Sequence, residues 1–216
     1  MVTESLRAAL GADRDPEFAM LLPEGWARLD ASDESRDLLL ARLRERLMAA
    51  HRPDLWAAAR ASVERAFAGL RRSGGVAVMM QLEREGDAPF VPASVTAAIE
   101  TGPDGATLDD LVAGLIARGA TPLGEDRRFI RLETREVRTE EAVRIGVTTV
   151  RYLTPVPGSR RRRALLLTAV LPHEPDTPED DPLLAATRFA IDAHVATLRW
   201  LPPGSSTSDT AGAGRA

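Results

Sequence analysis

The chain has 216 residues, of which 44% are apolar, and its 28 basic and 32 acidic side chains give a net charge of −4. Lysine and cysteine are both absent, which excludes Walker-type phosphate loops, Schiff-base chemistry, thiol nucleophiles, disulfides and iron–sulfur sites. Because charges of both signs are mixed along the chain, nucleic acid is disfavoured as a partner.

Residues 17–30 are predicted to form a β-hairpin. Phe18, Met20 and Leu22 alternate with their neighbours, and the Pro-Glu-Gly sequence at 23–25 supplies turn residues before a returning strand.

A helical hairpin is predicted over residues 33–72. Ser32 is a good N-cap for a first helix over 33–50, in which leucines recur at helical spacing. Pro53 suits the first turn of a second helix, which should end at the Ser-Gly-Gly sequence 73–75. The short joint between the helices favours antiparallel packing.

The rest of the chain is predicted to be mainly strands, with a helix over 107–118 and another over 182–198. The strands are expected at 76–83, 94–101, 129–137, 143–153 and 162–171. Short polar joints connect the last three strands, which is typical of an antiparallel meander. Residues 164–170 are apolar at both parities, so this strand should be central and covered on both faces.

These elements predict an α+β fold, an antiparallel sheet covered by helices on both faces (an α/β/α sandwich), with the helical hairpin 33–72 as an insertion. We expect an N-terminal segment at 1–16, a single domain at 17–202 and a disordered tail at 203–216. No secretory signal is recognisable, and no apolar run reaches the length of a membrane helix. The expected location is the cytoplasm.

The sequence offers no catalytic signature. None of the three histidines, His51, His173 and His194, has a partner nearby at metal-ligand or triad spacing, and the serine-hydrolase and dinucleotide-binding motifs are absent. The acidic segment 173–181 could hold a hard cation, but its spacing is not that of a calcium loop, and a solvated loop is favoured. We therefore expect no catalytic residue, no cofactor and no metal.

Two groups of residues are candidates for binding a partner. Arg160, Arg161 and Arg162 form part of the densest basic run and are expected at a hairpin tip, where they could grip an acidic partner. Trp56 and Phe67 could anchor a partner on the helical hairpin. Both lie on one helical stripe, which favours a role in the core over a role in binding.

The order of the elements resembles a known family. The opening sequence Phe-Ala-Met-Leu-Leu-Pro-Glu-Gly-Trp at 18–26, the antiparallel meander, and the closing helix that ends Ala-Thr-Leu-Arg-Trp at 196–200 are similar to the PsbP-like α/β/α sandwich family. That family includes a photosystem II subunit, Ran-binding nuclear import factors, bacterial lipoproteins and cytoplasmic chaperones of secretion effectors. The resemblance implies a non-catalytic binding scaffold.

The leading hypothesis is a cytoplasmic protein-binding module, such as a chaperone or adaptor, whose partner is another protein. It would act through the less covered face of the sheet or through the helical hairpin. The alternative is a small-molecule-binding protein or acid–base enzyme with a pocket between sheet and helices, using Glu133 or Glu136 with Arg144 or Arg151. The sequence gives no indication of the oligomeric state.

Overall fold

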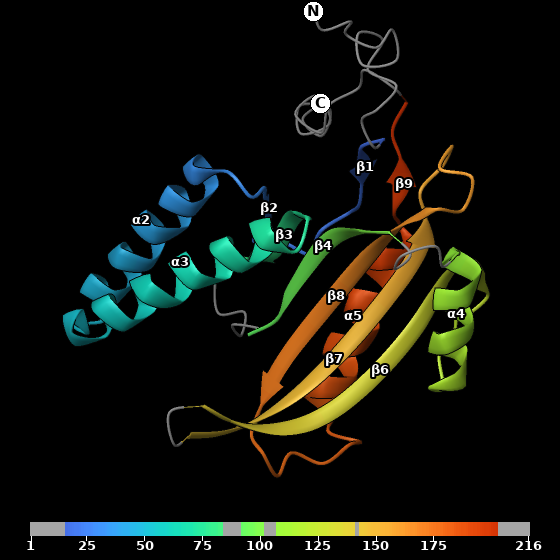
Figure 1. Ribbon diagram of the computed structural model, residues 1–216. Helices are drawn as coiled ribbons and strands as arrows, with labels where there is room; N and C mark the ends of the chain where they lie inside the picture. The colour runs from blue at the N-terminus through green and yellow to red at the C-terminus, as the bar shows by residue number, and fades with distance from the viewer. Residues whose placement is uncertain (1–15, 84–91, 102–106, 141–142, 203–216) are drawn as a thin grey trace, which may run out of the picture.

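The computed structural model describes residues 16–83, 92–101, 107–140 and 143–202. Its main component is a seven-stranded antiparallel sheet with strand order β2-β3-β4-β8-β7-β6-β5 (Figure 1). These strands are β2 (Trp26–Leu29), β3 (Gly75–Gln81), β4 (Ser94–Thr101), β5 (Thr121–Leu123), β6 (Asp126–Glu140), β7 (Val143–Pro155) and β8 (Arg163–His173). A second sheet pairs β1 (Phe18–Ala19) with β9 (Arg199–Trp200).

Helices cover both faces of the main sheet, as predicted. They are α2 (Asp33–Ala49), α3 (Trp56–Arg72), α4 (Leu108–Ala117) and α5 (Pro182–Ala196), and a short 3₁₀ helix, η1 (Pro53–Leu55), leads into α3. Within the described ranges, no helix is long and apolar enough to cross a membrane.

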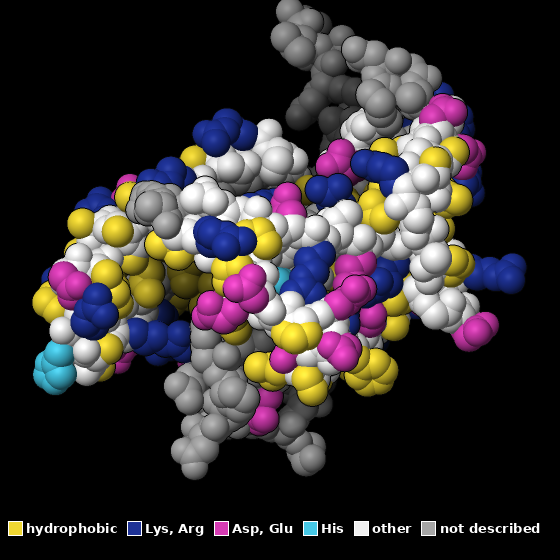
Figure 2. All heavy atoms as spheres, turned by 90° about the horizontal axis from the view of Figure 1, so that it is seen from below, with side chains coloured by type: hydrophobic (Ala, Val, Ile, Leu, Met, Phe, Trp, Pro, Cys, Tyr) yellow, Lys and Arg dark blue, Asp and Glu magenta, His cyan; other side chains and the backbone are white. Residues whose placement is uncertain are grey.

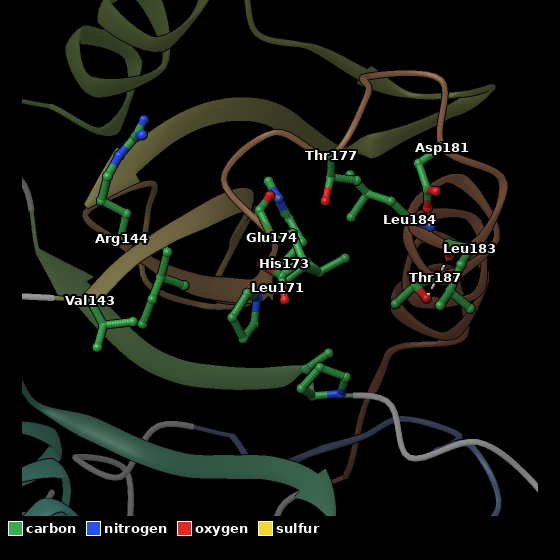
Figure 3. Close-up of a pocket in the computed structure, with 14 residues that line it drawn as sticks. Val143, Arg144, Leu171, His173, Glu174, Thr177, Asp181, Leu183, Leu184 and Thr187 are labelled. Atoms are coloured by element: carbon green, nitrogen blue, oxygen red, sulfur yellow. Dashed lines mark hydrogen bonds between the residues drawn. The ribbon is translucent and has the colours of Figure 1, made fainter. Parts of the chain in front are cut away.

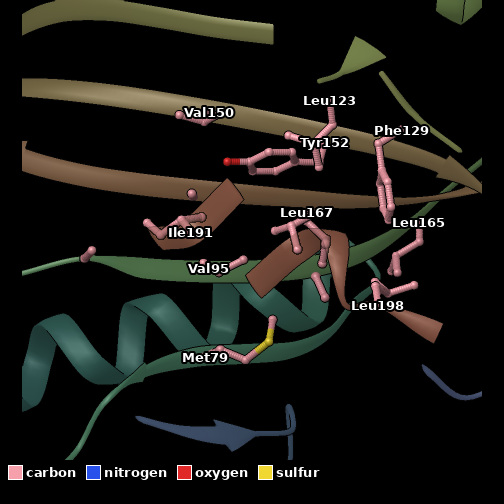
Figure 4. Close-up of a cluster of buried hydrophobic side chains, with 14 of the residues drawn as sticks. Met79, Val95, Leu123, Phe129, Val150, Tyr152, Leu165, Leu167, Ile191 and Leu198 are labelled. Atoms are coloured by element: carbon pink, nitrogen blue, oxygen red, sulfur yellow. The ribbon is translucent and has the colours of Figure 1, made fainter. Parts of the chain in front are cut away.

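Strand β8 is at the centre of the sheet, and its side chains enter a separate core on each face. Leu165 and Leu167 belong to the larger core with Tyr152 and with Ile191 of α5 (Figure 4). Leu166, which points the other way, packs against the smaller core that contains Leu108 and Leu115 of α4 and Leu132 of β6. The apolar run at both parities is therefore explained by one helix on each side.

The hairpin predicted at 17–30 is wrong, although its turn forms. Trp26 N donates to Pro23 O (3.0 Å), but β1 pairs with β9 at the end of the domain, and β2 pairs with β3. The residues before the turn find their partners near the end of α5: Leu21 N donates to the hydroxyl of Thr197 (2.9 Å), and Leu201 N donates to Glu17 O (2.7 Å). The alternation of apolar residues at 18–22 predicts a strand but not its partner, which lies about 180 residues further along the chain.

The helical hairpin forms as predicted, with Ser32 as the N-cap of α2. The two helices contact each other, and α3 contacts β3. Only α3 has buried residues, Phe67 and Leu70, whereas α2 has none. The hairpin therefore joins the sheet mainly through the second half of α3, and α2 lies outside it (Figure 1).

The other predicted elements lie close to their observed bounds. β4 matches its predicted range, and α4 begins with a capping box formed by Thr107 and Asp110. The short strand β5 was not predicted, because three residues at a sheet edge carry too little pattern. The predicted disordered tail at 203–216, and all but the last residue of the N-terminal segment 1–16, lie outside the described residues.

Neighbouring residues of β8 provide a test of this arrangement. Leu167 is fully buried (0% exposed) in the larger core, whereas the side chain of Thr168 points to the opposite face and is half-buried. We expect Leu167→Ala to lower the free energy of unfolding by about 2–5 kcal/mol and Thr168→Ala to lower it by less than about 1 kcal/mol. Urea denaturation of both variants measures this, and equal losses would contradict the assignment of the two faces.

Candidate functional site

A cavity of about 570 Å³ lies at the end of the sheet where β8 stops. The start of β7, the end of β8, the first turns of α5 and the residues before β4 line it. Figure 3 shows Val143 and Arg144 on one side, Leu183 and Leu184 of α5 on the other, and His173 between them.

The local sequence explains why β8 stops here. The last pair between β7 and β8 joins Gly146 to His173. The His173 Nδ1 donates to the carbonyl oxygen of Glu174 (2.8 Å), so its Nε2 accepts from the hydroxyl of Thr148 (3.1 Å). Gly146 makes room for this ring, since a Cβ there would lie 2.4 Å from two ring atoms of His173. The imidazole therefore fixes the point at which the chain leaves the sheet.

The cavity has an apolar floor and an apolar rim. Ala93, Leu171 and Leu184 are buried beneath it in the larger core. At the rim, Val143 is 58% exposed and Leu183 is 64% exposed. Large apolar side chains at that exposure, at the rim of a concave site, are typical of a binding surface.

The charged groups at the cavity have different partners. Asp181 is the N-cap of α5 and accepts from Leu184 N (2.8 Å). Arg144 is exposed and forms no ion pair with any residue that the structure describes. Figure 2, which views the molecule from the end that contains the cavity, shows acidic and hydrophobic side chains side by side there. Of these groups, the Arg144 guanidinium is available to an incoming acidic group.

A network of polar side chains links α5 to the sheet away from the cavity. The hydroxyl of Tyr152 donates to Asp192 (2.5 Å), and Arg131 bridges Asp192 (2.9 Å) and Glu133 (2.7 Å). Arg188 then donates to the other oxygen of Glu133 (2.6 Å). Each charged member has an opposite charge beside it, so the network holds α5 against β6 and β7.

The pKa values of the network follow from these contacts. Burial raises the pKa of Tyr152, and its hydrogen bond to Asp192 raises it further. Burial opposes the charged forms of Arg131 and Glu133, but their hydrogen bonds outweigh it, so the pKa of Arg131 is raised and that of Glu133 is lowered. Near neutral pH, Arg131 and Glu133 therefore stay charged and Tyr152 stays protonated and neutral, which does not suit them to proton transfer.

The acid–base pairs considered from the sequence are not brought together. Glu133 pairs with Arg131 and Arg188, and Glu136 pairs with Arg138. Neither pairs with Arg144, which lines the cavity, nor with Arg151, which is exposed on β7. Each glutamate instead pairs with an arginine two positions away on β6: Glu133 with Arg131, and Glu136 with Arg138.

The two candidate anchors on α3 have different surroundings. Phe67 is 2% exposed and belongs to the packing that joins α3 to the sheet, so its side chain is not on an accessible surface. Trp56 is half-buried at the first residue of α3. Neither lines the cavity.

The arginine run lies in the loop between β7 and β8, at the other end of these two strands from the cavity. Arg160 and Arg161 have left-handed backbone conformations, with φ values of 52° and 57°. Arg161 ion-pairs with Asp109 and its carbonyl oxygen accepts from Leu108 N (3.3 Å), so it ties the loop to α4. Arg160 and Arg162 are exposed and form no ion pair within the described ranges.

The sequence pointed to some of the residues that line the cavity, namely Arg144 and parts of the acidic segment 173–181, but not to its apolar residues. Val143, Leu171 and Leu183 come from three elements, and each fits its own element's pattern without marking a site.

No protein-family model and no curated protein sequence matches the chain. Among solved structures, it is similar to a protein from Bacteroides thetaiotaomicron VPI-5482, with a TM-score of 0.41 and 10% identity over 87% of this chain. The chain spans 46% of the length of that protein.

It is also similar to LpqN, a protein involved in cell envelope biogenesis of Mycobacterium tuberculosis, with a TM-score of 0.41 and 11% identity over 87% of this chain and 84% of LpqN. For a point mutant of the protein Mog1 the TM-score is 0.32 and the identity 11%, over 59% of this chain and 80% of Mog1. Values this low assign neither a family nor a function.

The network predicts a dependence of stability on pH. Because the pKa of Glu133 is lowered in the folded protein, its stabilising effect is complete above its unfolded pKa of about 4.3. The effect is lost as the pH falls through the lower folded value. We expect Glu133→Gln to lower the free energy of unfolding at pH 7 by about 1–3 kcal/mol and to reduce its fall in acid.

Glu136→Gln is the matched control, because Glu136 lies on the same strand in an exposed pair with Arg138 and should change stability by less than about 1 kcal/mol. Denaturation at a series of pH values between 3 and 7 measures both variants. A pH profile of Glu133→Gln parallel to that of the wild type would show that the network does not contribute in this way.

Proposed function

We propose that this protein is a non-catalytic binding protein that holds an apolar group of a partner protein in the cavity between β7, β8 and α5. The observation that supports this most directly is the combination of an apolar floor with an exposed apolar rim. Burying Val143 and Leu183 against a partner would remove their exposed apolar surface from water, which is favourable by about 25 cal/mol for each Å² buried.

The polar groups at the cavity and in the network between α5 and the sheet also favour binding over catalysis. His173 is held by Thr148 and Glu174, and Asp181 caps a helix. Glu133, whose pKa is lowered, is committed to two arginines. A catalytic acid would instead need a raised pKa and access to a substrate.

A small molecule is the second candidate ligand. The cavity volume of about 570 Å³ lies within the range of about 300–1,000 Å³ that is usual for such sites. The protein partner is preferred because Val143 and Leu183 are exposed on two separate elements at the rim, where they could contact a surface wider than the cavity.

The proposal includes a cellular setting. We propose that residues 17–202 act as one domain in the cytoplasm and that the protein serves as a chaperone or adaptor. The lack of cysteine is compatible with a reducing compartment. The helical hairpin, with α2 outside the core, is a second surface that such a protein could use.

Two exposed apolar residues of α5 allow a controlled test. Leu183 is at the rim of the cavity, whereas Phe189 is 75% exposed and does not line it. We expect Leu183→Asp to abolish retention of the partner, because a carboxylate at the rim would have to be desolvated, and Phe189→Asp to leave retention unchanged.

The measurement is affinity capture from an extract of the source cells on the immobilised full chain, followed by quantitative mass spectrometry. Circular dichroism spectra of the three proteins check that they fold alike. The proposal predicts proteins that the wild type and Phe189→Asp retain and Leu183→Asp loses. The same set on all three proteins would contradict it.

A further inference from the structure

The first three residues of β7 extend beyond the last paired residue of β8. The last residue of β8 to pair is His173, opposite Gly146, so Val143, Arg144 and Ile145 have no partner on the β8 side among the described residues. On their other side these three residues pair with β6, opposite residues 138–140. We call Val143–Ile145 the β7 extension.

The β7 extension lines the cavity, and its backbone groups on the β8 side have no strand partner among the described residues. In an antiparallel strand, both the N–H and the C=O of a residue point to one side, and successive residues alternate. At least one of the three residues must therefore point both groups to the side where β8 has ended. An exposed strand edge of this kind is a template for another extended chain.

The residues before β4 line the cavity on the other side of β8 from β7. Ser94 of β4 is opposite Val170 of β8, so Ala93 and Pro92 continue alongside the end of β8, and both line the cavity. By this register Pro92 lies opposite Pro172 of β8, so the described residues border the vacant position only on the β7 side. Three residues of the β7 extension correspond to about 10 Å of strand.

We infer that the cavity binds an extended segment of the partner protein, which pairs with the β7 extension in line with β8 and places an apolar side chain on the floor. This inference rests on the proposed function and specifies its partner. The occupant carries an acidic residue near Arg144, whose guanidinium has no ion pair in the described part of the chain. Backbone hydrogen bonds supply affinity, and the floor and Arg144 supply selectivity.

The side chains of the β7 extension fit this mode of binding. In β7, Tyr152 and Val150 point to the α5 face, and the alternation of a strand places Arg144 on that face and Val143 and Ile145 on the other. An added strand would cover the exposed Val143 from the side. A compact small molecule could cover the apolar floor but would not pair with the backbone of the β7 extension as a strand does.

The test uses peptides selected on the folded full chain. Phage-displayed random nonapeptides are selected on the immobilised wild type, and the consensus peptide is synthesised with a fluorescent label. Fluorescence polarisation then measures its affinity for the wild type, for Leu183→Asp and for Arg144→Glu. We expect a consensus with apolar residues at alternate positions and an acidic residue, and at least about tenfold weaker binding to either variant, equal to about 1.4 kcal/mol.

The decisive measurement is an N-methyl scan of the peptide, in which one amide nitrogen at a time is methylated. Methylation removes a backbone donor and leaves every side chain unchanged. A paired strand donates from every second residue to one neighbour. We therefore expect binding to fall about tenfold or more at alternate positions and to change little at the positions between them.

The outcomes separate the two proposals. Binding that is lost with Leu183→Asp but shows no two-residue period in the scan would overturn strand pairing and keep the cavity as the binding site. Failure to select any peptide whose binding depends on Arg144 and Leu183 would also overturn the inference. Self-association of the wild type that Val143→Asp abolishes would assign the edge to a second copy of this chain, and would overturn it too.

Discussion

Strand β8 has apolar side chains on both faces, and neither face can be left in water without a large loss of stability. Leu165 and Leu167 require cover from one side, and Leu166 requires it from the other. The helices α5 and α4 provide that cover, each with its own buried stripe. The position of β8 at the centre of the sheet and the layered architecture both follow from this requirement.

The cavity is a consequence of where that central strand ends. β7 and β6 continue past β8, while the chain turns away after His173 towards α5. The larger core therefore reaches the surface at this end, with Leu171 and Leu184 as its last buried members. The polar network of Tyr152, Asp192 and Arg131 fixes α5 against the sheet. The cavity between the end of β8 and the start of α5 is therefore a fixed part of the fold.

Most of the fold could be predicted from the sequence because the information was local. Capping at Ser32, the turn at 23–25 and the apolar run at 164–170 each depend on neighbouring residues. The pairing of β1 with β9 could not, since Phe18 meets Trp200 only after the domain has closed. The cavity could not be predicted for the same reason. Its residues come from separate elements, and nothing in their spacing shows that β8 ends before the first residues of β7.

The central claim is that the β7 extension is a free strand edge in the unbound protein. Amide hydrogen exchange, followed residue by residue by NMR, tests this directly. The account predicts that at least one amide within Val143–Ile145 exchanges at close to the rate of an exposed amide, while those of Thr148–Leu153, paired on both sides, are strongly protected. Uniform protection from Val143 to Leu153 in the free protein would contradict it.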